Sequence, residues 1–266
     1  MILKIILILK KIYIGFFSKI GFMPILKDVR ISKDSKDIKL HKTSTGDYFL
    51  PKYLYQDIII KSISKNRIYD EDVYECSKNY ITDNSSVLDL GASYGQMSIL
   101  MGKLKKNVTV HSFEANGYVF SILKKNLKIN NTQSQCYNVA ITDDSNKKYY
   151  FPKSNPEKFK TLGSYSLREN KEEGQNNQIK SMKIDDLHFD KKISFMKIDI
   201  QGLDLEGMMG ARKTIKEHRM PIIFEYENFF QNELNFNFQD YINFVNGIEY
   251  KFEKIIGCNN FLILPK

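Results

Sequence analysis

Strands and helices alternate from residue 85 to the end of the chain. Short apolar runs of strand length are separated by stretches in which apolar residues recur every three or four positions, as on one face of a helix. The predicted strands cover 86–91, 108–115, 134–141, 193–202, 220–227, 250–256 and 259–265, and the predicted helices cover 96–104, 117–130, 204–218 and 238–248. This order predicts an α/β fold with a doubly wound parallel sheet, covered by helices on both faces and completed at one edge by an antiparallel strand from the closing hairpin.

The chain ahead of this pattern contains different kinds of sequence. Residues 28–46 are polar and rich in lysine, and they predict a linker or an edge hairpin. Residues 48–63 predict a short strand that leads into a helix. Residues 70–81 predict a helix that is capped by Asp70 or Asp72 and packs ahead of the main sheet.

The first 26 residues predict a broadly apolar helix with a narrow polar stripe. Lys4, Lys10 and Lys11 interrupt its apolar sequence, so no uninterrupted run is long enough to cross a bilayer. No small-residue cleavage site follows, so we do not expect a removed signal peptide. Such a helix either lies at a membrane surface, with its lysines against anionic head groups, or packs on another subunit or on its own fold.

Composition narrows the class of protein only broadly. The 42% hydrophobic and 27% charged residues are those of an ordinary folded protein. The net charge of +9 comes from lysines spread along the chain rather than from a basic block, so we do not expect a nucleic-acid partner. Cys76, Cys136 and Cys258 lie far apart without metal-ligand spacing, which favours structural thiols in a reducing cytoplasm.

Acidic residues stand at the ends of four of the five parallel strands. They are Asp89, Glu114, Asp199 and Glu225, while the third strand ends at 138–141. In sheets of this kind, ligands bind beyond the carboxyl ends of the strands. Because an acid is costly to desolvate and adds little to packing, these strand ends predict a binding site.

A tight glycine turn follows the first of these strands, in the sequence DLGASYG. Gly91 and Gly95 permit a sharp bend and close backbone approach, and the helix that follows offers amide donors. Glu114 ends the next strand, where an acid commonly accepts hydrogen bonds from ribose hydroxyls. The turn and Glu114 together indicate an adenosine-bearing ligand.

Two cofactors compete for this turn. A dinucleotide needs GxGxxG around its pyrophosphate, but DLGASYG lacks the first two-glycine step and places Asp89 where a pyrophosphate would be repelled. S-adenosylmethionine has no phosphate but carries an ammonium group and a sulfonium cation, which acidic surroundings suit. The pattern therefore favours S-adenosylmethionine over a nicotinamide cofactor.

Six segments resemble the FkbM family of S-adenosylmethionine-dependent methyltransferases. They are VLDLGASYGQMSI, VHSFEAN, YNVAITDD, SMKIDDL, FMKIDIQGLDLEGMMGA and PIIFEYE, which follow the family's order over about residues 45–265. The resemblance implies the class I methyltransferase sheet, a Rossmann-like order 3-2-1-4-5-7-6 with an antiparallel last strand, and oxygen methylation, often of sugars or glycans. We accordingly divide the chain into a helical arm (1–26), an N-terminal extension and cap (27–84) and an S-adenosylmethionine-binding methyltransferase domain (85–266).

The resemblance also implies cofactor contacts. It places Asp89, Gly91 and Gly95 at the methionine end of the cofactor and Glu114 at its ribose. The full set that we expect to contact the cofactor is Asp89, Gly91, Ala92, Ser93, Gly95, Glu114, Ala115, Ala140 and Ile141. Gln201 departs from the family, which usually has glutamate there. We expect Gln201 to contact the acceptor and to alter substrate choice or metal affinity, or else to lie one layer behind the site.

Two carboxylates are candidates for proton transfer. A sugar hydroxyl is a weak nucleophile at neutral pH, so a neighbouring base assists it. Asp199 is the first choice, and Glu225 is the second, as a base or as an acceptor that orients the sugar, with an ion pair to a lysine or arginine as its alternative role. The four histidines are weaker candidates: His41 as part of a lid, and His111, His188 and His218 as structural residues.

Neither a metal nor a large cofactor besides S-adenosylmethionine is expected. No group of histidines and acids shows metal-ligand spacing, although Asp199 and Glu225 leave a divalent ion open. Acceptor contacts are expected from Ser164, Tyr165 and Ser166 in the long polar segment 152–181, unless that segment is a surface loop without function. We expect Tyr48 to close the other side of the site.

The sequence thus predicts an S-adenosylmethionine-dependent O-methyltransferase that acts on a sugar, a nucleotide sugar or a surface glycan. We expect it in the cytoplasm or peripherally at the inner face of the membrane. One alternative is a nucleic-acid methyltransferase, although no [DNS]PP[YF] element follows the fourth strand. The other is a membrane-associated S-adenosylmethionine-binding protein without catalysis, for which Gln201 is the only indication.

Overall fold

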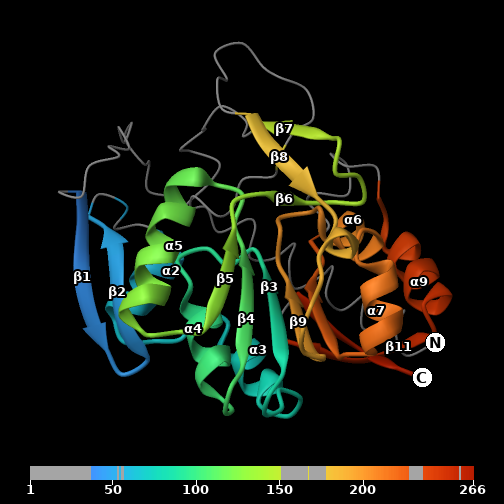
Figure 1. Ribbon diagram of the computed structural model, residues 1–266, viewed down its shortest axis with the longest axis horizontal. Coiled ribbons are helices and arrows are strands. Elements are labelled where there is room, and N and C mark those ends of the chain that lie inside the picture. The colour runs from blue at the N-terminus through green and yellow to red at the C-terminus, as the bar shows by residue number, and fades with distance from the viewer. Residues whose placement is uncertain are drawn as a thin grey trace, which may run out of the picture.

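A seven-stranded sheet forms the centre of the protein (Figure 1). The computed structural model describes residues 37–52, 54, 57–150, 167, 178–227, 236–257 and 259–266. The five parallel strands are β3 (Ser86–Leu90), β4 (Thr109–Phe113), β5 (Ser134–Tyr137), β9 (Ile193–Ile198) and β10 (Ile222–Glu225), and the closing hairpin supplies β11 (Tyr250–Ile256) and β12 (Asn260–Pro265). The strands lie in the order β5-β4-β3-β9-β10-β12-β11. Numbered along the chain within this sheet, that order is 3-2-1-4-5-7-6, which confirms the expected class I sheet.

The antiparallel strand of the closing hairpin lies inside the sheet and not at its edge. β12 pairs antiparallel with both β10 and β11, so β11 forms the edge. The expected antiparallel strand from the closing hairpin is therefore confirmed, but it is the second strand from the edge and not the edge strand itself. Burial explains the difference, because three consecutive residues of β12 are buried whereas β11 exposes Lys251, Glu253 and Lys254.

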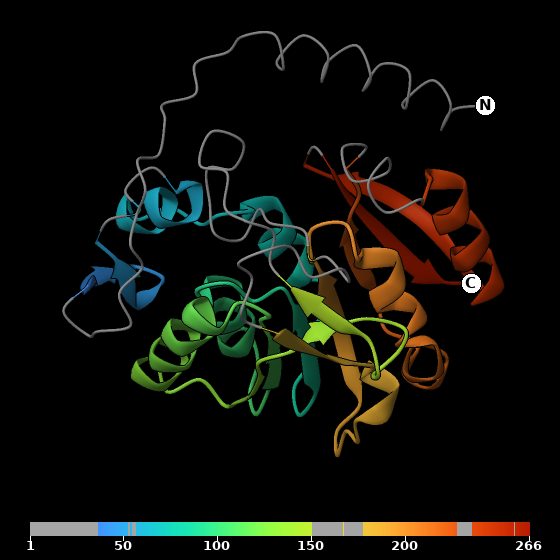
Figure 2. The same ribbon diagram turned by 90° about the horizontal axis from the view of Figure 1, so that it is seen from above.

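Helices cover both faces of the sheet (Figure 2). One face packs against α6 (Asp204–Met209), α7 (Arg212–His218) and α9 (Phe238–Gly247), and the other against α3 (Glu71–Ser77) and α4 (Gln96–Lys103). Successive strand residues alternate between these faces, so that Leu88 joins the α6–α9 core and Val87 joins the α3–α4 core. Every second residue of a strand thus faces α4, which decides where the charged strand residues point.

The single helix predicted over 204–218 is broken into α6 and α7. Gly210 ends α6 where a side chain would come within 1.9 Å of the carbonyl oxygen of Thr142. The first turn of α7 then has its own cap, because the Asp185 carboxylate accepts hydrogen bonds from the backbone amides of Lys213 and Thr214 at 3.0 and 2.9 Å.

The strand predicted over 134–141 is also two strands. β5 belongs to the main sheet, while β6 (Ala140–Ile141) pairs with β8 (Gln178–Met182) in a small sheet of order β6-β8-β7 that includes β7 (Lys148–Tyr150). A short helical turn, η3 (Ile184–Asp186), leads from β8 towards β9. The small sheet was not predicted, because β7 and β8 lie within or beside a polar segment with little strand pattern.

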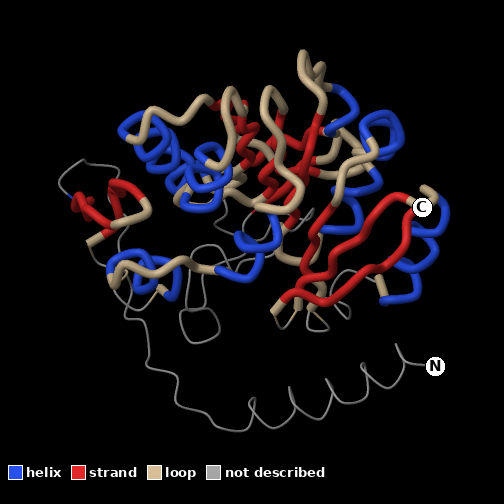
Figure 3. Tube along the Cα trace, turned by 90° about the horizontal axis from the view of Figure 1, so that it is seen from below, coloured by secondary structure: helices blue, strands red, loops and turns tan. Residues whose placement is uncertain are grey.

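The N-terminal extension forms a hairpin and two helices beside the main sheet. β1 (Ile38–Thr43) and β2 (Gly46–Pro51) make a separate two-stranded sheet, as Figure 3 shows. This hairpin packs on α5 (Gly117–Ile129), where the Asn126 side chain bonds both the backbone amide and the carbonyl of Phe49. α2 (Ile58–Ser64) begins at Asp57, whose carboxylate caps it. The predicted linker or hairpin over 28–46 is thus a hairpin in its described part.

Asp70 stands at the N-cap position of α3, so the predicted helix begins at one of its two predicted caps. Its backbone carbonyl accepts hydrogen bonds from the amides of Val73 and Tyr74, but its side chain makes no cap bond and its φ is 55°. The other predicted cap, Asp72, lies inside the helix. No helix among the described residues has the length and apolarity needed to span a membrane. The predicted helical arm, residues 1–26, lies outside the described residues.

Candidate active site

The glycine turn links the carboxyl end of β3 to α4. The amides of Gly91 and Ala92 donate to the Phe113 carbonyl at 3.0 and 2.9 Å, which fixes the turn to the end of β4. Gly91 has a φ of +82°, and a side chain there would come within 1.9 Å of the carbonyl oxygen of Asp199. Glycine is therefore required for the close approach between the turn and the end of β9.

Glu114 lies against this turn. It directly follows β4, and its carboxylate accepts hydrogen bonds from the amides of Ser93 at 3.0 Å and Asn116 at 2.7 Å. Burial raises the pKa of Glu114 to about 7, although the two amide donors oppose the shift. The structure thus brings the predicted ribose acid and the glycine turn into direct contact.

A narrow crevice opens beside the turn at the carboxyl edge of the sheet. It encloses about 40 Å³. Its lining comes from the turn, from the end of β9 and from the N-terminal extension, and consists of Ile59, Tyr69, Asp70, Gly91, Ala92, Ser93, Tyr94, Gln96, Met97, Lys197 and Asp199. Residues 67–70 of the N-terminal extension form a covering segment over the crevice. Gln96 holds this segment in place, because its side chain accepts a hydrogen bond from the Tyr69 amide and donates one to the Arg67 carbonyl, both at 2.9 Å.

Carboxylates gather at this crevice. The side-chain nitrogen of Gln201 lies 2.8 Å from Oδ1 of Asp199 and 3.4 Å from Oε2 of Glu225, so one amide bridges the two candidate proton acceptors. Burial and the neighbouring Asp199 raise the pKa of Glu225 well above its ordinary value. The same two causes raise the pKa of Asp70 to about 6 and also raise the pKa of Glu227.

Asp204 shapes the bend that carries Gln201. Its carboxylate accepts bonds from the amides of Ile200 at 3.3 Å and Gly202 at 3.1 Å, while Gln201 takes a left-handed conformation with φ 55°. Burial, followed by the charge of Asp199, raises the pKa of Asp204 to about 7. The predicted ion pair of Glu225 with a lysine or arginine is not among the interactions of the described residues.

Lys197 is a functional candidate that the sequence analysis missed. Its Nζ lies 3.6 Å from Oδ1 of Asp89, 3.6 Å from Oδ2 of Asp199 and 3.4 Å from the Gly91 carbonyl oxygen. Asp89 is fully buried, and Lys197 is only 5% exposed. The available signal was a single lysine inside the apolar strand sequence ISFMKI, since a charge there must find a buried partner.

Other predicted site residues lie elsewhere. Tyr48 is fully buried between β2 and α5, so the structure does not support its predicted role in closing the acceptor site. Ala140 and Ile141 are 2% exposed, in β6 of the small sheet. Gly95 begins α4, and Ala115 follows Glu114 and packs against the small sheet. Ser164, Tyr165 and Ser166 lie outside the described residues.

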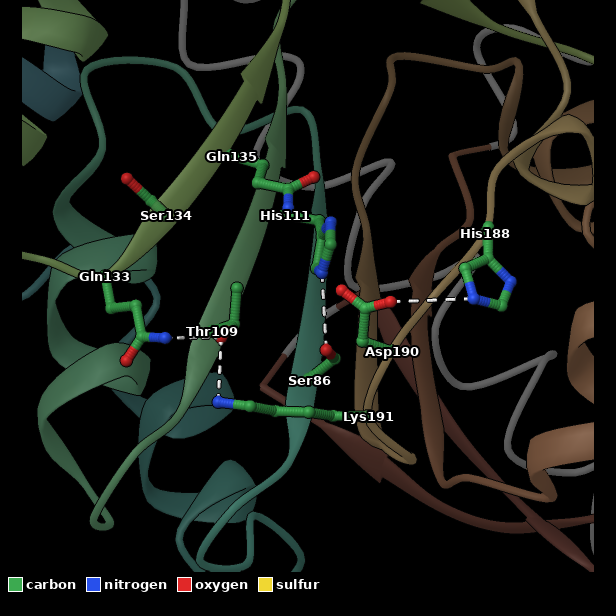
Figure 4. Close-up of a pocket in the computed structure, with 9 residues that line it drawn as sticks. All are labelled: Ser86, Thr109, His111, Gln133, Ser134, Gln135, His188, Asp190 and Lys191. Carbon is green, nitrogen blue, oxygen red and sulfur yellow. Dashed lines mark hydrogen bonds and ion pairs between the residues drawn. The ribbon is translucent and has the colours of Figure 1, made fainter.

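A larger cavity, about 290 Å³, lies at the amino edge of the sheet (Figure 4). It is lined by Ser86, Thr109, His111, Gln133, Ser134, Gln135, His188, Asp190 and Lys191. Burial lowers the pKa of His111 to about 4, and its Nε2 lies 3.3 Å from the Ser86 hydroxyl. Ligands of doubly wound sheets bind at the carboxyl edge instead, so the smaller crevice with its carboxylates is the candidate site.

The residues at the crevice fit S-adenosylmethionine. Gly91 leaves its backbone open to close approach, Glu114 offers carboxylate oxygens for ribose hydroxyls, and Asp70 and Asp199 suit the positive charges of the cofactor. A pyrophosphate would instead meet these acids. No cluster of three or more histidines, cysteines and acids that could hold a metal ion occurs among the described residues.

Comparison with known proteins adds a family. The family model described as the methyltransferase FkbM domain matches residues 89–252. No curated protein matches the chain. A solved structure of methyltransferase FkbM from Methylobacillus flagellatus KT is 18% identical with a TM-score of 0.49, and covers 69% of this chain and 44% of its own. The chain therefore spans less than half the length of that protein.

Two further solved structures are similar over most of this chain. The tRNA (uracil-54, C5)-methyltransferase of Pyrococcus abyssi, in complex with S-adenosyl-L-homocysteine, is 12% identical with a TM-score of 0.45, and covers 86% of this chain and 44% of its own. TYW2 of M. jannaschii, in complex with AdoMet, is 11% identical with a TM-score of 0.40, and covers 89% of this chain and 87% of its own.

Proposed function

This chain belongs to the FkbM methyltransferase family, and on that premise we propose that it methylates a hydroxyl group of a sugar, a nucleotide sugar or a surface glycan, with S-adenosylmethionine as the methyl donor. The observation that carries the proposal is the acidic crevice. Asp70 and Asp199 line it, and Glu225 and Glu227 lie close enough to Asp199 for its charge to raise their pKa values.

Carboxylates in this arrangement suit a polyhydroxylated acceptor. An ionised carboxylate only accepts hydrogen bonds, and a sugar presents several hydroxyl donors at short spacing. Asp199, Glu225 and the Gln201 amide form a single bridged group that offers several hydrogen-bond acceptors. A neutral sugar therefore finds partners there without bringing an opposing charge.

Asp199 is proposed as the base of the reaction. When bound, S-adenosylmethionine supplies a methyl carbon that forms a bond to the acceptor oxygen as its bond to sulfur breaks, with the electron pair of that bond remaining on sulfur. Asp199 takes the proton that the hydroxyl loses, and Gln201 and Lys197 fix the direction of its two oxygens. Glu225, held as the protonated partner by burial and by Asp199, orients the acceptor.

The crevice disfavours a nucleic-acid acceptor. Phosphate contacts require lysines or arginines that face the strand, because they supply most of the affinity for nucleic acid. Lys197 is the basic residue among the eleven that line the crevice, and it already contacts two carboxylates. A nucleic acid carries phosphates on both sides of each nucleoside, so the phosphates beside a methylated hydroxyl would meet the negative charge of the crevice. A nucleotide sugar has a single diphosphate on one side of its sugar, and we place that group outside the crevice.

The expected compartment follows from the same proposal. Nucleotide-linked sugars are cytoplasmic substrates, and the described cysteines Cys76 and Cys136 are free thiols, as in other proteins of reducing compartments. We propose contact with the inner face of the membrane through residues 1–26, which lie outside the described residues. Release of the chain from vesicles on deletion of 1–26 tests that contact.

Label transfer tests the function directly. The full chain is incubated with S-adenosylmethionine labelled in its methyl group and with a panel of nucleotide sugars, neutral oligosaccharides, polyamines and transfer RNA. We expect label in a sugar-containing acceptor, stable to mild base as an ether is. Calorimetry with S-adenosylmethionine alone accompanies the panel, so that a protein that does not bind the donor is distinguished from one offered the wrong acceptor. Transfer only to RNA or only to amines would overturn the proposal.

A further inference from the structure

A buried ammonium group lies directly under the candidate site. Lys197 stands in β9 opposite Asp89 of β3 in the register of the sheet. Both project to the face covered by α4, as do Val87 and Phe195, the residues two positions earlier in their strands. Burying either charge alone costs several kcal/mol, so the two side chains depend on each other.

Asp89 alone does not explain where the lysine points. Asp89 Oδ2 accepts a hydrogen bond from Ser98 at 2.5 Å, and its Oδ1, which has no hydrogen-bond partner, faces Lys197. Lys197 Nζ also lies 3.4 Å from the carbonyl oxygen of Gly91 and 3.6 Å from Oδ2 of Asp199. One ammonium group thus lies beside Asp89, the glycine turn and the proposed base Asp199.

The other charges around Asp199 are negative. The titratable groups that face Lys197 and Asp199 are Asp89 on β3, Glu114 after β4, Glu225 on β10 and Glu227 after it, Tyr69 and Asp70 ahead of α3, and Asp204 on α6. Burial lowers the pKa of Lys197, but the carboxylates of Asp199, Asp89, Asp70 and Glu225 raise it above its ordinary value overall. The lysine therefore stays charged, and it brings a positive charge to a group of carboxylates that includes Asp199.

We propose that Lys197 is a positioning residue for methyl transfer, which keeps Asp199 ionised, aims it into the crevice and ties it to the glycine turn. The inference rests on the proposed function of Asp199 as the base. Asp89 has a separate part: it keeps the lysine paired at the moment when Asp199 accepts a proton and loses its charge. The ammonium group then still has one carboxylate beside it.

Two variants distinguish a role of Lys197 in positioning Asp199 from a role that only neutralises the charge of Asp89. Lys197→Met leaves the Asp89 carboxylate buried without an opposite charge, and we expect this protein to be strongly destabilised. Asp89→Asn combined with Lys197→Met removes both charges from the buried pair and keeps its shape. Lys191→Met is the matched control, because Lys191 binds Asn107 and Thr109 at the amino edge, far along the sheet from the turn.

The readout is the titration of the Asp199 carboxyl group, followed by 13C NMR on protein labelled at the aspartate side chains. The signal is assigned by its loss in Asp199→Asn. In the double variant we expect its titration midpoint to rise by about 1 pH unit, the lower end of the effect of removing an opposite charge, because the like charge of Asp89 is removed as well. In Lys191→Met it stays where it is in the unmodified protein. The acidic limb of kcat against pH should move with it.

An unchanged midpoint in the double variant overturns the inference. So does full turnover of the double variant at neutral pH, since Lys197 would then serve only to neutralise Asp89. The NMR titration needs no acceptor. If no sugar is methylated but the midpoint moves, the proposed function fails while the link between Lys197 and Asp199 stands.

Discussion

At the scale of single residues, the candidate site is built on backbone conformations that few side chains tolerate. Asp70, Ser93 and Gln201 all have positive φ values, of 55°, 48° and 55°, and all three lie at the crevice or beside it. Each such residue costs about 1–3 kcal/mol unless its surroundings hold it there. Here Glu114 bonds the Ser93 amide and Gln201 bonds Asp199, so the strain is held by the same contacts that form the site.

Gly91→Ala tests the tightest of these positions. A methyl group at Gly91 would lie 1.9 Å from the Asp199 carbonyl oxygen, and that backbone contact has no flexible end that could yield. We expect loss of S-adenosylmethionine binding by calorimetry and a fall in unfolding free energy of at least about 1–2 kcal/mol, the cost of the left-handed conformation alone. Gly117→Ala is the control, because the nearest atom to its new methyl group is at an ordinary 3.5 Å. Equal effects of the two substitutions would contradict the close approach.

Asp199→Asn tests the proposed base. Asparagine keeps the size of the side chain but cannot take the hydroxyl proton, so turnover should fall by about 100-fold or more. The KM for S-adenosylmethionine should change by only a few fold, because Glu114 and the glycine turn remain. Steady-state kinetics with the acceptor found in the label-transfer panel measures both constants. Turnover within a few fold of the unmodified protein would remove Asp199 from the role of base.

At the scale of elements, the covering segment ahead of α3 belongs to the site as much as the strand ends do. Ile59, Tyr69 and Asp70 all come from the N-terminal extension, and Gln96 ties that extension to the start of α4. The extension is thus one wall of the crevice. Two side-chain hydrogen bonds from Gln96 fix the backbone of this wall at Arg67 and Tyr69.

Gln96→Ala should therefore loosen this wall. Loss of two hydrogen bonds, each worth about 1 kcal/mol, makes local opening of residues 67–70 about tenfold or more frequent. Hydrogen exchange followed by mass spectrometry should show faster exchange there, and the KM for S-adenosylmethionine should rise. Gln133→Ala is the matched control, because the side chain of this glutamine at the amino edge bonds only the Thr109 hydroxyl among the described contacts. Equal exchange at 67–70 in both variants would mean that packing, and not Gln96, holds the segment.

The sequence predicted the strands of the main sheet because each is a short apolar run between polar turns. It predicted the acids at strand ends for the same reason, since a charge at the edge of such a run stands out. It did not predict β7 and β8, whose residues are too polar to show a pattern. It placed Asp70 at a helix cap on local grounds, but it could not show that burial and the charge of the distant residue Asp199 raise the pKa of Asp70. Lys197 was missed because a strand pattern says that a residue is buried and not which partner it meets.

At the scale of the whole molecule, a basic chain encloses an acidic site. The net charge is +9, yet Glu114, Asp204 and Asp70 have pKa values raised to about 7, 7 and 6, in each case mainly by burial. The folded protein therefore holds protons on these acids at a pH where the unfolded chain has released them. A cation that enters the site takes the place of those protons, so binding of S-adenosylmethionine and pH are linked through the same groups.

Stability of the free protein should accordingly fall as the pH rises from about 4 to about 7. A group that binds more protons when folded lowers the unfolding free energy as protons are removed, and three acids act in this direction. His111, His41 and His218 act in the opposite direction, because burial lowers their pKa values, that of His111 to about 4, and their neutral forms are favoured as the pH rises. Glu225 and Glu227, whose pKa values burial and Asp199 raise, add to the effect of the three acids. Urea unfolding at about pH 5 and about pH 7.5 should show lower stability at the higher pH by about 2 kcal/mol or more. Saturating S-adenosylmethionine should narrow the difference, and Glu114→Gln should make the pH dependence shallower. Stability that is constant or increases with pH would mean that the acids of the crevice are ionised in the free protein.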